Sequence, residues 1–299
     1  MRVLLVANPR AGRVNPARLA HIARLLQSAR VEVGAVPASG PGIAAASLRH
    51  ALQGLSPADT RVIAVGGDGT IHAILPALVG TAFPLAIVPA GTLNALAGEL
   101  HIPQGIESAI RVAVGGEPRR IDVGVVNGRP FVQMAGVGFD GAAVHTVVPT
   151  ENKNMLSPLV LARGLRLLST YRPSRFRITT ESSTLSAKAW LILVANASRY
   201  TYRLCASPGA DIADGWLDLW VFAARSARQT VGQVLALLRG THGGYPGVHH
   251  LRARSAQIAS HPPVWLHLDG DAGGRTPATV SVLPRALTVI VPSADKIVA

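Results

Sequence analysis

The sequence predicts an α/β protein in two parts: an N-terminal parallel sheet flanked by helices, and a C-terminal region of mostly antiparallel strands. Two observations predict the first part. Short apolar runs alternate with helical patterns up to about residue 115, and glycine clusters follow several of these runs. A third observation predicts the second part, because strand-length apolar runs follow one another from about residue 120 with few helical patterns between them.

The N-terminal elements follow in order along the chain. Four runs predict strands, and they span 2–7, 31–36, 61–65 and 84–89. The continuous apolar run 2–7 is typical of a buried parallel strand. Apolar residues at helical spacing predict helices at 15–29, 42–54, 70–79, 92–100 and 106–116. Asn15 and Pro16 are a typical cap and first-turn pair for the first helix. Pro76 should kink or shorten the third helix.

In the second part, Asn127–Gly128 is the strongest turn signal, and it predicts a hairpin between two strand-like runs within 120–136. Further strand patterns lie at 175–181, 188–195, 217–223, 250–258, 264–268 and 278–283, and helical patterns lie at 157–170 and 226–239. This succession predicts an antiparallel, sandwich-like β structure. The last apolar run, 286–292, is expected to return to the first sheet.

The change of pattern near residue 120 predicts two domains. The first comprises residues 1–122, joined by 286–299 if the last strand returns to it, and the second comprises residues 123–285. A chain of 299 residues is long for one domain and sufficient for two. With 48% apolar residues, each domain can bury a substantial core.

Basic residues outnumber acidic ones by 29 to 16, which gives a formal charge of +13. Such a charge attracts nucleotides, nucleic acid or anionic membranes, although a general preference for Arg in the genome would produce it too. No block of like charges indicates a nucleic-acid-binding tail. The single cysteine, Cys205, excludes an intrachain disulfide and fits a reducing compartment.

No targeting or membrane-spanning segment is indicated. The apolar run within residues 1–10 is too short for a signal peptide and is typical of a first strand. No uncharged apolar stretch reaches the roughly 18 residues that a spanning helix needs. We therefore expect a cytoplasmic protein that is soluble or lies on a membrane surface.

The stretch "VGGDGTI" at 65–71 carries the first chemical signal, because it follows a predicted strand and opens a helix. Glycines let backbone N–H groups approach a ligand closely, and a helix N-terminus adds partial positive charge, so the stretch favours phosphate. Asp68 is the exception, since a carboxylate repels phosphate unless a cation or proton lies between them. It would either hold a cation or polarise a hydroxyl, or it would cap a helix and brace the turn.

Two more loops at the same sheet edge carry Gly with Asn or Thr. "NPRAG" at 8–12 includes Asn8, and "PAGTLNALA" at 89–97 includes Thr92 and Asn94. Ligands of open parallel sheets bind at the carboxyl ends of the strands, so the three loops together indicate a phosphate site. Neither the P-loop pattern nor a correctly placed dinucleotide fingerprint is present.

Six motifs occur in an order that resembles the diacylglycerol kinase catalytic family, which includes bacterial lipid kinases and the sphingosine and ceramide kinases. They are "ANPRAG", "GGDGT", "PAGTLN", "GVGFDG", "DGWLD" and "LDGD", and they span residues 7 to 271. "GGDGT" is shared with NAD kinases, whereas "PAGTLN" with "GVGFDG" is similar to the lipid branch. The resemblance implies a nucleotide-binding α/β domain, a β-rich lipid-binding domain and an active site in the cleft between them.

The resemblance also implies roles for individual residues. The family's ATP-contacting positions are matched by Gly66, Gly67, Asp68, Gly69, Thr70 and Thr92, and positions that line the same pocket are matched by Asn8 and Asn94. Asp214 matches a cation-binding position. Asp271 falls where the family usually has a Glu that accepts the proton of the substrate hydroxyl. ATP and Mg²⁺ are the implied cofactors, and a lipid at a membrane surface is the implied substrate, with no nucleic-acid partner.

The chain departs from the family pattern at several positions. Asp271 is one methylene shorter than Glu, so its carboxylate reaches about 1.5 Å less far, while a general base must come within roughly 3 Å of its proton. His72–Ala73 stands where the family often has Asn-Glu, Ala95 replaces an Asp, and Ala38 or Ser39 replaces a Thr. Two alternatives remain beside an ATP-dependent lipid kinase: a NAD kinase-like phosphotransferase, and a catalytically weak member that binds lipid or nucleotide.

Two segments are candidates for membrane contact. The segment 157–177 interleaves Leu and Val with Arg, which suits an anionic lipid surface, although an ordinary packed helix with a basic outer face has the same pattern. The segment 231–240 is a second candidate, for which burial in the core is the stronger alternative.

Overall fold

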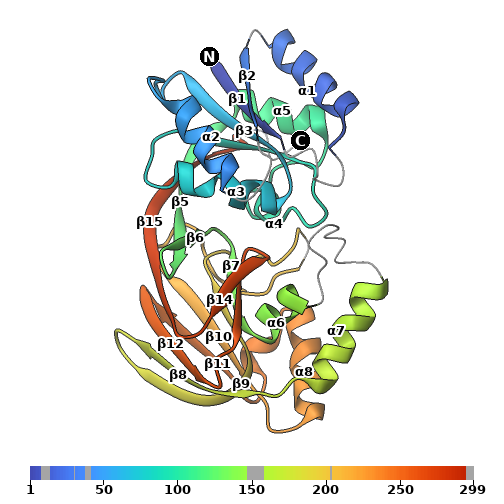
Figure 1. Cartoon of the computed structure of the whole chain (residues 1–299), viewed down its shortest axis with the longest axis vertical. Coiled ribbons are helices and arrows are strands. Elements are labelled where there is room, and N and C mark those ends of the chain that lie inside the picture. Colours follow the sequence, from blue (N-terminus) through green and yellow to red (C-terminus); the bar gives the residue numbers. More distant parts are fainter. Residues whose placement is uncertain (8–13, 30, 38–41, 147–157, 203, 294–299) are drawn as a thin grey trace. The chain divides into compact units, whose positions relative to one another are not determined.

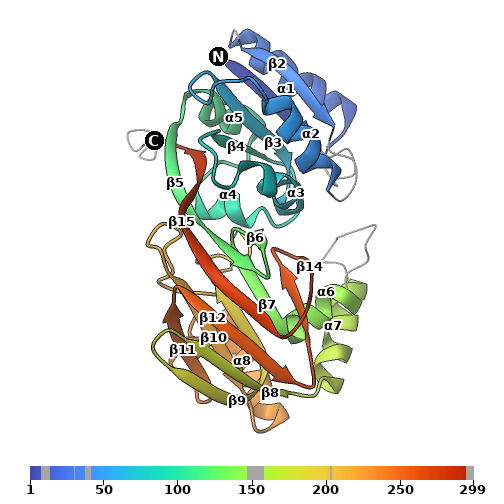
Figure 2. The same cartoon turned by 60° about the vertical axis from the view of Figure 1, so that its left-hand side comes forward.

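The computed structural model describes residues 1–7, 14–29, 31–37, 42–146, 158–202 and 204–293. The chain divides into two compact units, residues 1–121 with 285–299 and residues 122–284. Strands β5 (Glu117–Val126) and β15 (Ala278–Val291) each run from one unit into the other (Figures 1 and 2).

The first unit is built on a parallel sheet with the strand order β2-β1-β3-β4-β15. Its other strands are β1 (Arg2–Ala7), β2 (Glu32–Pro37), β3 (Thr60–Gly66) and β4 (Leu85–Pro89). All five residues of β4 are buried, as the continuous apolar run predicts for a strand covered on both faces. The last strand, β15, joins this sheet parallel to β4 at Val289 and Leu85.

Five helices cover this sheet: α1 (Pro16–Ser28), α2 (Ile43–Leu52), α3 (Asp68–Leu78), α4 (Ala95–Glu99) and α5 (Ile106–Gly115). α1 contacts α5, whereas α2 contacts α3. The chain moves outward from β1 to β2 and then returns past β1 to β3, so right-handed crossovers place α1 on one face and α2 and α3 on the other. The carboxyl ends of β1 and β3 therefore lie at a topological switch point, where open sheets bind ligands.

Local sequence accounts for the helix ends of this unit. Asn15 caps α1, because its side chain accepts a hydrogen bond from the backbone N–H of Arg18, and Pro16 occupies the first position. α3 continues past Pro76 to Leu78 and begins at Asp68, two residues before the predicted start, so the proline does not shorten it. α4 is shorter than predicted, because residues 92–94 form the loop before it.

The second unit is antiparallel, as predicted. Its main strand order is β14-β13-β7-β9-β8-β12-β15, and β9 also pairs with β10, which pairs with β11. These strands are β7 (Met134–Gly138), β8 (Ser174–Thr180), β9 (Thr184–Ala195), β10 (Leu217–Ala223), β11 (Val248–Ala253), β12 (Ser255–His261), β13 (Trp265–Leu268) and β14 (Asp271–Arg275). β6 (Arg129–Phe131) pairs with β5, and the turn between them has positive φ at Asn127 and Gly128, which confirms the predicted hairpin.

Strand β9 contributes to two hydrophobic cores. Ile192 and Val194 pack among the strands, in the interior of the sandwich-like layers. Trp190 and Leu193 point to the other face, where residues of three helices pack against them or close by. These helices are α6 (Phe139–Thr146), α7 (Pro158–Thr170) and α8 (Ala227–Leu238). None of the helices in the described part of the chain is long and apolar enough to span a bilayer.

Two strand predictions were wrong. The runs 278–283 and 286–292 were predicted separately, but both belong to the single strand β15. The run 250–258 was predicted as a single strand, but it belongs to two strands that meet at Arg254. β11 pairs with β10, whereas β12 pairs with β8 and β15, so the chain changes neighbours at this point. The apolar alternation changes phase at the break, from Leu251 and Ala253 before it to Ala256 and Ile258 after it, and the prediction of one strand overlooked this change.

Candidate active site

The loops after β3 and β4 touch through their backbones at two glycines. A Cβ atom added to Gly91 would lie 2.4 Å from the Cα of Gly67, and one added to Gly67 would lie 2.9 Å from the Cα of Gly91. Neither position can therefore carry a side chain without moving the other loop. The backbone N–H of Ala90 also donates to the carbonyl of Gly66 at 2.8 Å. The two predicted glycine loops thus form one continuous surface at the carboxyl edge of the sheet.

The carboxylate of Asp68 links the same two loops. One oxygen accepts a hydrogen bond from the N–H of Ala95 at 3.1 Å, and the other accepts one from the N–H of Leu96 at 3.2 Å. Both donors belong to the first turn of α4, whose partial positive charge offsets the negative charge of Asp68. Asp68 therefore caps a helix, as one of the two predicted alternatives has it. The capped helix is α4, which follows β4, and not α3, which Asp68 itself begins.

Asn94 organises the second loop. It lies in the left-handed region at φ 45° and is 5% exposed. Its Oδ1 accepts from the N–H of Gly91 at 2.9 Å, and its Nδ2 donates to the carbonyl of Gly91 at 3.1 Å and to Oε1 of Gln104 at 2.9 Å. These bonds fix the loop, so Asn94 shapes the site through the backbone around Gly91.

The remaining N-terminal candidates differ in exposure. Thr70 is buried, and a Cβ on Gly66 would lie 2.1 Å from its Oγ1, so its hydroxyl packs against the end of β3. Gly69 and Thr92 are exposed at the same edge. With α4 already capped by Asp68, the N-terminus of α3 remains to attract phosphate. Asn8, Ala38 and Ser39 lie outside the described residues.

In the second unit, Asp271 begins β14 directly after a two-residue hairpin turn. Asp269 and Gly270 have φ of 48° and 84°, as a type I′ turn requires, and they join β13 to β14. The carboxylate of Asp269 accepts hydrogen bonds from the N–H groups of Val132, Gln133 and Met134 at 2.7, 2.9 and 3.0 Å. The position of half-buried Asp271 is therefore set by a turn that is anchored to the neighbouring strands.

A buried polar cluster supports this hairpin. Nε2 of His267 donates to Asp140 at 2.6 Å, the hydroxyl of Tyr200 donates to the other oxygen of Asp140 at 2.9 Å, and Nδ1 of His267 accepts from the N–H of Gly270 at 3.2 Å. Gly136 leaves room for the cluster, since a Cβ there would lie 2.2 Å from Nε2 of His267. The cluster thus reaches the residue immediately before Asp271.

The charges of this cluster shift its pKa values. Burial by itself raises the pKa of Asp140, but the charge and hydrogen bond of His267 outweigh burial and lower it. Burial by itself lowers the pKa of His267, but Asp140 outweighs that effect and raises it. Burial, together with Asp140, holds the pKa of Tyr200 well above its ordinary value. Each group thus favours the charged form of the other, whereas the hydrogen bond that Nδ1 accepts from Gly270 requires the neutral imidazole, so this bond forms when His267 is deprotonated.

His267, Asp269 and Tyr200 were assigned no role from the sequence. His267 and Asp140 are 127 residues apart, so no local spacing connects them. The Asp-Gly step at 269–270, directly after the apolar run 264–268, is a recognisable turn signal that could have identified the hairpin.

Asp214 has polar partners already. One carboxylate oxygen accepts from the N–H of Trp216 at 2.9 Å, and the other is paired with Arg252. Burial raises the pKa of Asp214, in part against the charge of Arg252, and Asp211 and Asp218 raise it further. Mg²⁺ in proteins often uses one or two carboxylates with water and phosphate, so Asp214 fits as a single ligand if Arg252 moves away. Within the described ranges, no group of three or more His, Cys, Asp or Glu side chains could hold a metal ion.

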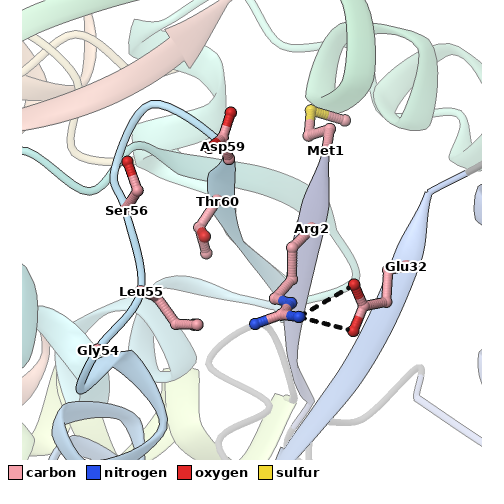
Figure 3. A pocket seen from close by; sticks show the side chains of 8 residues that line it. All are labelled: Met1, Arg2, Glu32, Gly54, Leu55, Ser56, Asp59 and Thr60. Atoms are coloured by element: carbon pink, nitrogen blue, oxygen red, sulfur yellow. Dashed lines mark hydrogen bonds and ion pairs between the residues drawn. The ribbon is translucent and has the colours of Figure 1, made fainter.

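One cavity of about 440 Å³ in the first unit lies away from these loops (Figure 3). It is lined by Met1, Arg2, Glu32, Gly54, Leu55, Ser56, Asp59 and Thr60. Arg2, Glu32 and Thr60 are the first residues of their strands, so the cavity lies at the amino edge of the sheet. Open parallel sheets bind ligands at the opposite edge, and the Arg2–Glu32 ion pair already occupies this one.

Comparison with known proteins agrees with the motifs. Residues 2–126 match the diacylglycerol kinase catalytic domain family, and residues 134–291 match the YegS C-terminal NAD kinase beta sandwich-like domain. The chain is 28% identical over 236 residues to a diacylglycerol kinase of Staphylococcus saprophyticus, which covers 78% of this chain and 77% of that protein. A Staphylococcus aureus diacylglycerol kinase is 27% identical over 236 residues, and the match covers 78% of this chain and 74% of that protein.

A further relative is an uncharacterized Synechocystis protein, sll0036, which is 32% identical over 240 residues. The match covers 78% of this chain but spans only 55% of the length of that relative. Among solved structures, a diacylglycerol kinase from Bacillus anthracis superposes with a TM-score of 0.74 at 21% identity, covering 98% of this chain and 97% of that one. Another Bacillus anthracis structure superposes with a TM-score of 0.81 at 22% identity, and the match covers 98% of this chain and 97% of that one. This likeness establishes the fold, and the two matched domains establish the family. The chain belongs to the diacylglycerol kinase catalytic domain family and carries its YegS-type C-terminal domain.

Proposed function

We propose that the protein is an ATP-dependent lipid kinase that transfers the γ-phosphate to the hydroxyl of diacylglycerol or a related lipid. The contact between Gly67 and Gly91 carries the proposal, because it joins two loops into one backbone surface at the switch point of the sheet. Such a surface suits a triphosphate, since backbone N–H groups and the N-terminus of α3 favour negative charge. Membership of a kinase family supports this reading.

Each candidate residue has a role in the proposed reaction. The lipid hydroxyl oxygen attacks the γ-phosphorus, the bond from this phosphorus to the bridging oxygen breaks, and ADP leaves. Asp271 accepts the proton of the hydroxyl as the new P–O bond forms. Gly66, Gly67, Gly69, Thr70 and Thr92 contact the nucleotide, with Asn8 lining the same pocket and Asn94 holding the second loop in shape.

Asp68 and Asp214 complete the proposal. Asp68 holds the two loops together and orients either substrate or metal from its place beside the N-terminus of α4. Asp214 would be the protein ligand of Mg²⁺, which supplies neutralisation of phosphate charge when bound. Because a metal at Asp214 competes with Arg252, metal affinity should rise when Arg252 is removed.

The lipid substrate implies work at a membrane surface, and we propose peripheral association from the cytoplasmic side. Turnover is tested with labelled ATP, Mg²⁺ and mixed micelles that contain diacylglycerol, a glycerophospholipid or a sphingoid base, with NAD as a soluble acceptor. Transfer to a lipid alone supports the proposal. Transfer to NAD alone would replace it by the NAD kinase alternative, and transfer to none would leave the binding-protein alternative.

Asp271→Asn tests the proposed base. This variant should lose turnover by at least a hundredfold while nucleotide affinity stays unchanged, because the amide cannot accept the proton. Asp271→Glu is the matched control, since it keeps the acid and should retain turnover. Full activity of Asp271→Asn would show that another group is the base.

A further inference from the structure

Helix α8 faces the core with a polar residue. Gln233 is fully buried, and its Oε1 accepts from the indole N–H of Trp190 at 2.7 Å. Its Nε2 donates to the carbonyls of Ala223 and Pro246 at 2.9 and 3.1 Å. These three bonds fix which side of α8 faces the sheet, because rotation of the helix would leave the buried amide of Gln233 and the indole N–H of Trp190 unsatisfied.

The opposite side of α8 is apolar and exposed. Val231, Leu235 and Leu238 are 52%, 44% and 58% exposed, and their spacing of four and three residues places them on one face. Burial in the core, the alternative considered for this segment, is therefore excluded for these three side chains. A soluble helix usually shows the reverse arrangement, with the apolar stripe inward.

Helix α7 adds a fourth exposed apolar side chain, Leu165, at 61% exposure. The inner sides of both helices pack against the same core cluster, through Leu168 of α7 and through Val234 and Leu237 of α8. Both helices therefore cover the same face of the sheet (Figure 1). In the described part of the chain, the large exposed hydrophobic residues are Met1, Ile43, Leu165, Val231, Leu235, Leu238 and Leu283, so more than half lie on these two helices.

Exposed arginines lie on or beside the same two helices. They are Arg163 and Arg166 of α7 and Arg225, Arg228 and Arg239 in or beside α8. Arg228 lies one turn before Val231, and Arg239 lies one turn after Leu235. Neither 158–170 nor 225–239 contains an Asp or a Glu. The surface thus combines aliphatic groups with positive charge that no acidic residue of these segments neutralises.

We propose that this helical surface, formed by Leu165, Val231, Leu235 and Leu238 with the five arginines, docks the protein on an anionic lipid bilayer. The aliphatic side chains enter the acyl region, while the arginines contact lipid phosphates and anionic head groups. A second copy of the chain fits less well, because a symmetric contact would bring the arginines against their own equivalents. The inference deepens the proposed function, since a bilayer is where a lipid substrate resides.

The test is co-sedimentation of the full chain with phosphatidylcholine vesicles, with and without phosphatidylglycerol, at low and high salt. The unchanged protein should bind only the anionic vesicles, and more weakly at high salt. Leu235→Gln with Leu238→Gln should weaken binding about tenfold or more, and Arg228→Gln with Arg239→Gln about tenfold at low salt. The matched control is Ile43→Gln with Arg24→Gln, which removes one exposed apolar group and one charge from the first unit and should bind as the unchanged protein does.

Three outcomes would overturn the inference: α8 variants that bind like the unchanged protein, equal losses in the control, or a dimer in sedimentation velocity that the leucine changes abolish. Circular dichroism confirms that each variant is folded, as expected for exposed positions. A water-soluble short-chain diacylglycerol separates this inference from the proposed function. The α8 variants should phosphorylate it at the unchanged rate, whereas failure of the kinase proposal would remove that activity from every variant and leave vesicle binding measurable.

Discussion

Nε2 of His267 donates a hydrogen bond to the carboxylate of Asp140 at 2.6 Å, although 127 residues separate the two in the chain. The His267 side chain is 2% exposed and that of Asp140 is 16% exposed. Nδ1 of His267 also accepts a hydrogen bond from the N–H of Gly270. The pair therefore connects the start of α6 to the turn that precedes Asp271. This largely buried, hydrogen-bonded pair is thus part of the support for the proposed base.

His267→Gln should destabilise the protein by about 3–5 kcal/mol, because it leaves the charge of Asp140 with Tyr200 as its remaining partner in the cluster. Urea unfolding measures the change. The double variant His267→Gln with Asp140→Asn should lose less than the sum of the two single losses, since the groups interact directly. Strict additivity would show that the contact contributes nothing to stability.

The contribution of the pair should depend on pH. The folded state raises the pKa of His267 above 6.5, so the stability it contributes is complete below that value and is lost as pH rises through the folded pKa. The difference in unfolding free energy between the unchanged protein and His267→Gln should therefore be larger near pH 6 than near pH 9. A difference that stays constant across this range contradicts the ion pair.

At acid pH the stability that Asp140 contributes changes with pH in the opposite direction. The folded state lowers the pKa of Asp140 below 3.8, so its contribution is present above that value and is lost as pH falls through the folded pKa. Thermal unfolding of the unchanged protein and Asp140→Asn should accordingly converge in strong acid. If the gap persists there, the carboxylate charge is not what stabilises the cluster.

Two substitutions distinguish the capping of α4 by Asp68 from a role of its carboxylate in turnover: Asp68→Ala and Asp68→Asn. Alanine leaves the N–H groups of Ala95 and Leu96 without their acceptor, which should cost about 1–2 kcal/mol in thermal or urea unfolding. Asparagine keeps one acceptor oxygen and should cost less than 1 kcal/mol. Under the proposed function both variants lose turnover in the labelled-ATP assay. If Asp68→Asn retains full turnover, Asp68 is a structural cap alone.

Gly91→Ala should destabilise the protein by about 1–3 kcal/mol and weaken nucleotide binding, because its Cβ would lie 2.4 Å from the Cα of Gly67. Gly115→Ala is the matched control, since a Cβ there meets no atom within 4 Å. Calorimetric titration with a non-hydrolysable ATP analogue measures the affinity. Equal effects of the two substitutions would show that the loop contact is unimportant for the site.

Much of the fold follows from local sequence. Apolar runs identify β1 to β4 of the first unit, and Asn127–Gly128 identifies the hairpin of β5 and β6, because both signals lie within a few residues. At Arg254 the alternation changes phase, which marks a break locally, but it does not show that the two halves pair with different strands. Pairing partners are set by tertiary contacts, which periodicity does not encode.

In the candidate site, too, local features could be predicted from the sequence and contacts between distant segments could not. Motifs identify the glycine loops, but they do not reveal that Asp68 caps α4 across the loop surface or that His267 pairs with Asp140, because these contacts join distant segments. For α8 the apolar spacing does not show whether the stripe faces the core or the outside. Val231, Leu235 and Leu238 have the spacing of a core stripe, and the hydrogen bonds of Gln233 decide that they face outward instead.

The contact between Gly67 and Gly91 limits how this chain can be redesigned. A library that varies one loop alone, for instance to alter the choice of nucleotide, will recover glycine at both positions, because each backbone occupies the space that the other's side chain would need. New specificity has to come from neighbours whose side chains reach open space, such as exposed Thr92.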